Sequence, residues 1–291
     1  MIGVPVRSTT MTSSGSPWAP PSSAAAGWYA DPTTGLPRYF DGIRWADNQP
    51  ATPAAKEPIP TLPFKVAVIS VGLLALSLVA ANLFELVADS SHLPLMAALV
   101  VGLLIVYGPS VVWIAIVRHR FGGPASGLKI RWSDLGWGPV IWIITVIIEV
   151  ITIAILTGFD VPIESNVSDI TTGQVSTVYL VLTVISLVVI APVVEEAVFR
   201  GLVLHGLLSG WPAFPVILVQ GILFGLAHFI PAFGMSNLGL VAVLSAVGVV
   251  LGTAAYLLRR IGATVIAHAI VNGVVVIVVW TGVFDQFSSL I

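Results

Sequence analysis

The sequence predicts an all-α membrane protein, a polytopic bundle of about seven transmembrane helices preceded by a disordered tail and a small aromatic-rich, β-like module. Of its 291 residues, 57% are hydrophobic and only 9% are charged, whereas soluble domains carry about 25% charged residues. The apolar residues also gather into runs of about 20, the length that crosses ~30 Å of hydrocarbon. We therefore expect a multi-pass protein of the cell membrane, in contact with the lipid bilayer.

The composition narrows the chemistry that this chain can perform. It contains no cysteine, which excludes disulfides, thiolate metal sites and a cysteine nucleophile and leaves His, Glu, Asp and Ser. The net charge of −2, without a basic patch, gives no indication of nucleic acid as a partner. Residues 1–60 contain no apolar core of signal-peptide length, so we expect no cleaved leader.

The N-terminal part divides into three segments. Residues 1–26 are rich in Ser, Thr, Pro and Ala and are expected to be disordered, because they offer little apolar surface to bury. Residues 27–47 form the aromatic module. Residues 48–63 are rich in proline and form a linker to the transmembrane domain at 64–291.

Two aromatic clusters define the module at 27–47. Trp28 and Tyr29 precede a turn-rich segment, Tyr39 and Phe40 follow it, and the next two residues, Asp41-Gly42, are a strong hairpin signal. The alternative is an aromatic-studded tail with only a local hairpin. The pattern resembles a short domain of unknown function found at the cytoplasmic N-termini of actinobacterial membrane proteins. That the module recruits an unidentified protein partner is a hypothesis.

The apolar runs after residue 63 predict seven transmembrane helices, near 65–87, 95–117, 139–158, 178–208, 213–230, 238–258 and 262–283. Their loops differ in charge. All the charged residues of the loop after the second helix are cationic: Arg118, Arg120, Lys129 and Arg131. All those of the loop after the third helix are acidic: Asp160, Glu164 and Asp169. The positive-inside rule then places the N-terminus in the cytoplasm and the C-terminus outside it.

The stretch A-P-V-V-E-E-A-V-F-R, residues 191–200, places three ionisable side chains at the end of an apolar run. A charged side chain near the bilayer centre costs about 2.5–3.5 kcal/mol on insertion scales. Glu196 and Arg200 stand one helical turn apart in the favourable order for an ion pair. Glu195 is turned about 100° away from Glu196 and has no local partner. The alternative is a solvated charge cluster at a helix end.

Two further polar pairs interrupt the later helices. Phe224 lies one turn before His228, and His268 lies one turn before Asn272, so the members of each pair share a helix face. Each pair is open to the alternative of ordinary interhelical packing or hydrogen bonding. Glu149 is a further intramembrane carboxyl whose role stays open.

Four more residues complete the polar and small-residue pattern. Gly221 and Gly225 form a small-xxx-small pair that allows a neighbouring helix to approach closely. His119 and His205 have the sequence context of ordinary interfacial residues.

The depths of these polar residues along their helices indicate that they meet. Glu195 lies 14 residues before Ser209, and His228 lies 16 residues after Pro212, which is about 21 and 24 Å from the shared turn at 1.5 Å per residue. His268 joins them if the hairpin around Ser209 projects beyond the membrane surface as an amphipathic extension. Intramembrane ionisable residues that converge indicate a functional site.

The motifs Glu-Glu-x-x-x-Arg, Phe-x-x-x-His and His-x-x-x-Asn on successive helices resemble those of the CPBP family of intramembrane metalloproteases. This family includes relatives of the eukaryotic type II CAAX prenyl endopeptidase and of bacterial bacteriocin-processing or immunity proteins. The resemblance covers residues 178–283 and includes Pro192 before the glutamates and the Phe-Arg-Gly that ends at Gly201.

The resemblance implies an endopeptidase that cleaves a peptide or membrane-tethered protein near the cytoplasmic face. In the family's pattern Glu195 and His228 act on a water, while His268 and Asn272 stabilise the oxyanion or hold a metal. Glu196, Arg200 and Phe224 support these groups. The side chains of Glu195, His228 and His268 suit zinc or a similar divalent metal.

Two other functions are compatible with the same residues. A non-catalytic member of the fold would bind or shield a peptide, as immunity proteins do. A proton-coupled transporter would use the buried carboxylates as a relay, but no inverted repeat is evident in the sequence.

Overall fold

The computed structural model describes residues 25–30, 37–45, 61–91, 93–122, 127–163 and 175–281. The chain divides into two compact units, Met1–Pro58 and Ile59–Ile291. Most of the expected disordered tail and of the proline-rich linker lies outside the described residues, and so do the acidic residues expected at 164 and 169 and the last ten residues.

The N-terminal unit contains a two-stranded antiparallel sheet. Strands β1 (Gly27–Ala30) and β2 (Pro37–Phe40) pair with Trp28 opposite Tyr39, whose rings meet edge to face at 5.5 Å. Asp41-Gly42 does form a turn, as the sequence predicted, but this turn does not join β1 and β2. It follows β2 and returns the chain so that Trp45 forms a bridge with Phe40. The Asp41 carboxylate accepts hydrogen bonds from the backbone N–H groups of residues 43 and 44, each at 2.7 Å.

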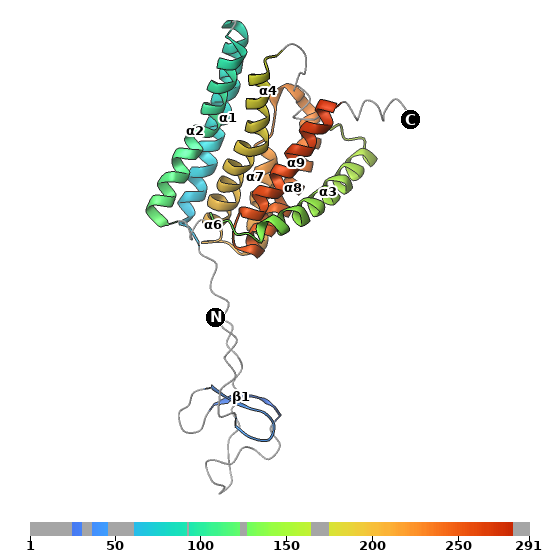
Figure 1. Cartoon of the computed structure of the whole chain (residues 1–291). Helices are drawn as coiled ribbons and strands as arrows, with labels where there is room; N and C mark the ends of the chain where they lie inside the picture. Colours follow the sequence, from blue (N-terminus) through green and yellow to red (C-terminus); the bar gives the residue numbers. More distant parts are fainter. Residues whose placement is uncertain are drawn as a thin grey trace. The chain divides into compact units, whose positions relative to one another are not determined.

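The second unit is a bundle of helices, drawn in Figure 1. Three long helices come first: α1 (Phe64–Ser91), α2 (Leu95–Phe121) and α3 (Asp134–Gly158). A continuous helical rod of alternating α and π segments follows: α4 (Thr177–Ile185), η2 (Ser186–Ile190), α5 (Ala191–Glu196), η3 (Ala197–Val203) and α6 (Leu204–Leu207). The chain ends with α7 (Ala213–Leu226), the short η4 (Pro231–Ser236), α8 (Asn237–Leu258) and α9 (Gly262–Thr281).

Six of these helices are long and apolar enough to cross a membrane: α1, α2, α3, the rod at 177–207, α8 and α9. Each coincides with an expected helix. The expected helix at 213–230 is the exception, because α7 has only 14 residues and ends at Leu226. A proline disfavours helical geometry in the residue before it, and Pro231 follows closely. Asn237 then binds both backbone groups of Ile230 and stabilises the non-helical connection to α8.

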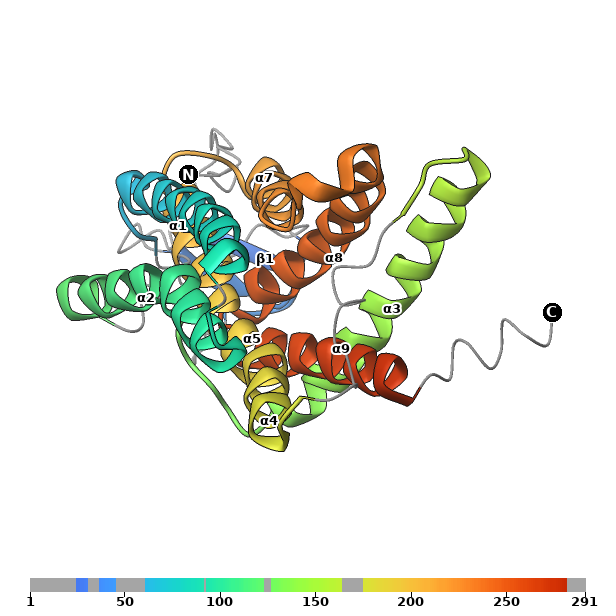
Figure 2. The ribbon, with the colours of Figure 1, turned by 90° about the horizontal axis from the view of Figure 1, so that it is seen from above.

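The rod at 177–207 forms the centre of the bundle. Viewed along the bundle, α5 lies among α1, α2, α8 and α9, with α3 on the outside against α9 (Figure 2). Every residue from Glu196 to Leu207 is buried, whereas α1, α2 and α3 expose many large apolar side chains, as lipid-facing helices do. Residues from all the central elements, including Phe199, Phe224 and Leu251, form one hydrophobic core.

Several helix termini meet at one end of the bundle. The backbone N–H of Leu62, just before α1, donates to the carbonyl of His205. The segment at 127–131 pairs with the start of α9 through Ile261 and Gly262. Arg260 donates to the buried carboxylate of Asp134 at 2.6 Å. The described residues of the cationic loop after α2 therefore lie at the same end as Arg260.

His205 corrects one expectation about this end of the bundle. It is 1% exposed and its Nδ1 contacts the carbonyl oxygen of Arg200, so residues 200–207 do not form an amphipathic extension into solvent. His119, in contrast, is exposed near the end of α2, as expected.

Candidate active site

Glu196 and Arg200 form a fully buried ion pair in the middle of the bundle. Arg200 Nη1 lies 2.8 Å from Glu196 Oε1, and both side chains are 0% exposed. The sequence predicted this pair from the spacing of its members along a helix. Arg200 also donates to the carbonyl oxygen of Gly248 on α8 at 3.1 Å, so the pair holds the rod against α8.

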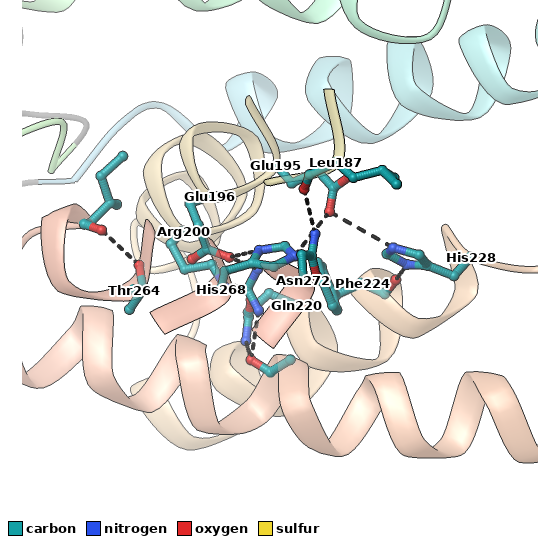
Figure 3. A network of polar contacts seen from close by, with 12 residues as sticks. Leu187, Glu195, Glu196, Arg200, Gln220, Phe224, His228, Thr264, His268 and Asn272 are labelled. Carbon is teal, nitrogen blue, oxygen red and sulfur yellow. Dashed lines mark hydrogen bonds and ion pairs between the residues drawn. The ribbon is translucent and has the colours of Figure 1, made fainter. Parts of the chain in front are cut away.

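Glu195 occupies a different environment from its neighbour. Its side chain is 15% exposed, and the hydroxyl of Tyr107 on α2 donates to its Oε1 at 3.0 Å. Its Oε2 makes no hydrogen bond to any described residue. This oxygen lies 3.8 Å from His228 Nε2 and 3.9 Å from His268 Nε2. Figure 3 shows the carboxylate between the two imidazole rings.

The hydrogen bonds of the two histidines fix which ring nitrogen carries the proton. His228 Nδ1 lies 2.8 Å from the carbonyl oxygen of Phe224, and His268 Nδ1 lies 3.0 Å from Glu196 Oε1. Carbonyl and carboxylate oxygens accept hydrogen bonds, so both Nδ1 atoms are the donors. In the neutral imidazoles Nε2 then bears the lone pair, and these are the two nitrogens that lie 3.8 and 3.9 Å from Glu195 Oε2.

Phe224 is the packing centre of this site. Its ring centroid lies 4.8 Å from that of His228 and 5.7 Å from that of His268. The guanidinium carbon of Arg200 lies 4.4 Å from the same ring, within cation–π range. Phe224 therefore contacts both histidines and covers the buried ion pair.

Asn272 reaches the site through a local break in the rod. In the π segment η2, the N–H of Ala191 donates five residues back, to Ser186. At this spacing the next N–H would serve the carbonyl of Leu187, but Pro192 has no N–H. Asn272 Nδ2 donates to the Leu187 carbonyl oxygen instead, at 2.8 Å. The combination of a π segment and a proline thus attaches α9 to the rod beside the glutamates.

The close packing of α7 on α8 positions His228. A side-chain carbon on Gly221 would lie 2.8 Å from the backbone nitrogen of Val249, and one on Gly225 would lie 2.8 Å from that of Ser245. The sequence expectation of a close helix approach at this small-residue pair is confirmed. Gln220 on the same helix donates to the Gly248 carbonyl at 2.9 Å, so α7 and the rod are held by the same backbone group.

The structure thus brings the expected polar residues together: Glu195, Glu196, Arg200, Phe224, His228, His268 and Asn272. Glu149 is half-buried on α3 and makes no hydrogen bond or ion pair with a described residue. Sequence reasoning missed Tyr107, because α2 carries no polar motif. The one signal was a tyrosine in the middle of an apolar run, followed by Gly108 and Pro109.

The fit of a metal ion depends on three of these side chains. In the described part of the chain, no group of three or more His, Cys, Asp or Glu residues meets the geometry of a metal site. Glu195 Oε2 lies 3.8 and 3.9 Å from the two Nε2 atoms, wider than the roughly 3.4 Å between ligands of tetrahedral zinc. The donor chemistry does fit, since metal-ligating histidines use their other N–H on a carbonyl or carboxylate. Glu195, His228 and His268 would be the ligands.

Two family models match the chain. Residues 177–274 match the family described as type II CAAX prenyl endopeptidase Rce1-like, and residues 26–58 match a protein family of unknown function, DUF2510. Neither the curated proteins nor the solved structures contain a match to this chain.

The first family match contains the whole cluster of polar side chains, from Glu195 to Asn272, inside a multi-pass membrane bundle. This combination supports, at a coarse level, an intramembrane protease. Over residues 177–274 the chain is similar to the Rce1-like family of type II CAAX prenyl endopeptidases.

Proposed function

We propose that this protein is an endopeptidase that uses Glu195 to activate a water and cleaves a peptide or membrane-tethered protein near the cytoplasmic face. One observation carries the proposal. Glu195 Oε2 is a buried carboxylate oxygen without a hydrogen-bond partner among the described residues, and it lies 3.8 and 3.9 Å from the Nε2 atoms of His228 and His268. A general base needs an accessible lone pair close to the bond that reacts.

Each of these residues has one role in the proposed hydrolysis of the peptide bond. Glu195 takes the proton of the attacking water as the new C–O bond forms, and returns a proton to the leaving amine as the C–N bond breaks. His228 holds the water from the opposite side. Asn272 uses one amide N–H on Leu187, and its second N–H donates to the oxyanion of the tetrahedral intermediate together with His268 in its protonated form.

Zinc or a similar divalent ion is part of the proposal. Glu195, His228 and His268 would hold it, and His268 Nε2 would then be a ligand instead of a donor to the oxyanion. When bound, such an ion supplies Lewis acidity and lowers the pKa of a bound water. Glu196 and Arg200 lie behind this set and orient His268 through the 3.0 Å contact to its Nδ1.

The orientation in the membrane follows from the charges at one end of the bundle. The cationic loop residues and Arg260 gather where α2, the rod and α8 end. The positive-inside rule favours this end as the cytoplasmic one, with the N-terminus inside and the C-terminus outside. The N-terminal module then lies in the cytoplasm, where it would recruit a protein partner.

The test is cleavage by the full-length protein purified in detergent or nanodiscs, on a quenched library of membrane peptides. We expect cleavage by the wild type and loss of it in Glu195→Gln, His228→Ala and His268→Ala, with folding retained. Glu149→Gln is the matched control, because it removes another intramembrane carboxyl outside the cluster and should leave cleavage unchanged.

Metal content is measured on the same samples by elemental analysis, before and after chelation. About one zinc per chain, with activity lost on chelation and restored on readdition, supports the metal-dependent form. A folded wild-type protein that cleaves no member of the library would contradict the proposal and favour a peptide-binding role for the same residues.

A further inference from the structure

Tyr107 contacts the site from a helix that carries none of the three motifs. Its hydroxyl lies in the middle of α2 and donates to Glu195 Oε1 at 3.0 Å. Among the described residues this is the hydrogen bond that the Glu195 carboxylate receives, since Oε2 has none. The other titratable groups facing this carboxylate are His228 and His268, with the Glu196–Arg200 pair behind them.

We propose that Tyr107 is a positioning residue of the active site, whose hydroxyl fixes Glu195 Oε1 so that Oε2 is the oxygen presented to the histidines and the attacking water. This inference rests on the proposed function of Glu195 as the base. The terminal torsion of a glutamate side chain is broad and roughly two-fold, so an unrestrained carboxylate exchanges its two oxygens. The hydrogen bond from Tyr107 makes the two oxygens inequivalent.

The surroundings of Tyr107 hold its hydroxyl in place. Tyr107, Ser110, Ile114 and Val117 recur at helical spacing on the face of α2 that packs into the bundle, where Ser110 and Val117 are buried. On the same helix, Trp113 donates its indole N–H to Ser70 of α1 at 3.0 Å. The position of the hydroxyl is therefore set by packing on α1 and the rod, independently of the helices that carry the histidines.

The contact also defines a geometry for the water. A carboxylate oxygen that already accepts a hydrogen bond is a weaker base than its unoccupied partner. With Oε1 occupied by Tyr107, the proton of the water goes to Oε2, the oxygen that both imidazole Nε2 atoms face. Tyr107 acts on the reaction through Glu195.

The variant that tests this role is Tyr107→Phe in the full-length protein, because it removes only the hydroxyl. A hydrogen bond to a charged group corresponds to a turnover loss of about 10- to 100-fold. We expect kcat to fall by that factor while KM changes by less than about 3-fold, since no substrate contact is lost.

Tyr256→Phe is the matched control. Tyr256 lies half-buried in α8, and its hydroxyl makes no hydrogen bond with a residue that the structure describes. This variant should leave kcat and KM at their wild-type values.

An infrared measurement tests the contact without relying on activity. The difference spectrum between wild type and Glu195→Gln identifies the carboxylate band of Glu195. Tyr107→Phe should shift that band, and Tyr256→Phe should not.

The two readouts together separate the outcomes. A shifted band in Tyr107→Phe together with reduced kcat and little change in KM supports the inference. Wild-type kcat in Tyr107→Phe would overturn the positioning role while leaving the proposed protease function intact. If the wild-type protein cleaves nothing, the proposed function is overturned, and a band shift in Tyr107→Phe then shows a structural contact alone.

Discussion

Glu195 and Glu196 are adjacent in the sequence, but they occupy opposite kinds of site. Glu196 is completely buried, is paired with Arg200 at 2.8 Å and accepts from His268 at 3.0 Å. Each carboxylate has one oxygen without a hydrogen-bond partner in the described part of the chain. Glu195, however, is 15% exposed, its other oxygen accepts from Tyr107, and its unpartnered oxygen lies within 3.9 Å of two imidazole nitrogens. The 100° rotation between consecutive helical residues is enough to produce this difference.

The surroundings of a buried carboxylate determine whether it contributes to stability or to catalysis. A buried charge is tolerated when a cation and hydrogen bonds surround it, and it then contributes structure. A carboxylate with an unoccupied lone pair in a partly open site is available to take a proton. We expect substitutions around Glu196 to affect the free energy of unfolding first, and those around Glu195 to affect turnover first.

The largest stability effect is expected for Arg200→Met. It leaves the Glu196 carboxylate buried without its cation, and breaking a buried pair on one side destabilises by about 3–5 kcal/mol. Thermal unfolding in detergent measures the change. The double variant Glu196→Leu/Arg200→Met should recover much of the loss, since neither charge remains. A single variant as stable as the wild type would contradict a structural role for the pair.

Overpacking of α7 against α8 tests the site from its histidine side. Gly225→Ala places a methyl group 2.8 Å from the backbone nitrogen of Ser245, and overpacking typically destabilises by about 1–3 kcal/mol. The displacement of α7 should also reduce turnover through His228. Gly102→Ala is the control, because a side-chain carbon there meets nothing within 4 Å. Equal unfolding midpoints for the two variants would show that the glycine contact is not close.

Asn272→Ala tests the attachment of α9 beside Glu195. It leaves the Leu187 carbonyl without a donor, and an unsatisfied buried group costs about 1–3 kcal/mol. We expect a lower unfolding midpoint together with lower turnover. Asn82→Ala removes an exposed amide that binds within its own helix and should change neither quantity. Turnover that survives Asn272→Ala would remove this residue from the oxyanion site.

The smallest effect is expected for a carboxylate in the N-terminal unit. The backbone N–H groups of Arg44 and Ile43 lower the pKa of the exposed Asp41 below its usual value of 3.8. Its stabilisation of the turn is therefore present above the unfolded-state value and is lost as the pH falls through the lower folded-state pKa. At neutral pH, Asp41→Ala should speed amide hydrogen exchange at residues 43 and 44 and leave cleavage unchanged. Unaltered exchange would contradict the turn contact.

Local sequence patterns predicted most of the helices and the meeting of the motifs. Apolar runs located the six long helices because lipid requires that length. Helical spacing predicted the Glu196–Arg200 pair, and the residue counts to the shared turn predicted that Glu195 and His228 would lie level. These features depend on distances along one helix or across one tight turn.

Features that depend on contacts between distant segments were not predictable in this way. The contact of Tyr107 with Glu195 joins residues 88 positions apart, and no motif on α2 announces it. The bond from Asn272 to Leu187 arises from a π segment whose next donor is a proline. The burial of His205 depends on the chain before α1, whose Leu62 N–H binds the same residue.

In this protein Glu195 serves catalysis and the adjacent Glu196 serves stability. The variants Glu195→Gln and Glu196→Gln, measured side by side, test this division most directly. The measurement is the turnover of one membrane peptide, together with the unfolding midpoint of each purified variant. We predict that Glu195→Gln loses about 10²–10⁴-fold in turnover with a wild-type midpoint, whereas Glu196→Gln lowers the midpoint. Wild-type turnover in Glu195→Gln, or an unchanged midpoint in Glu196→Gln, would contradict the account.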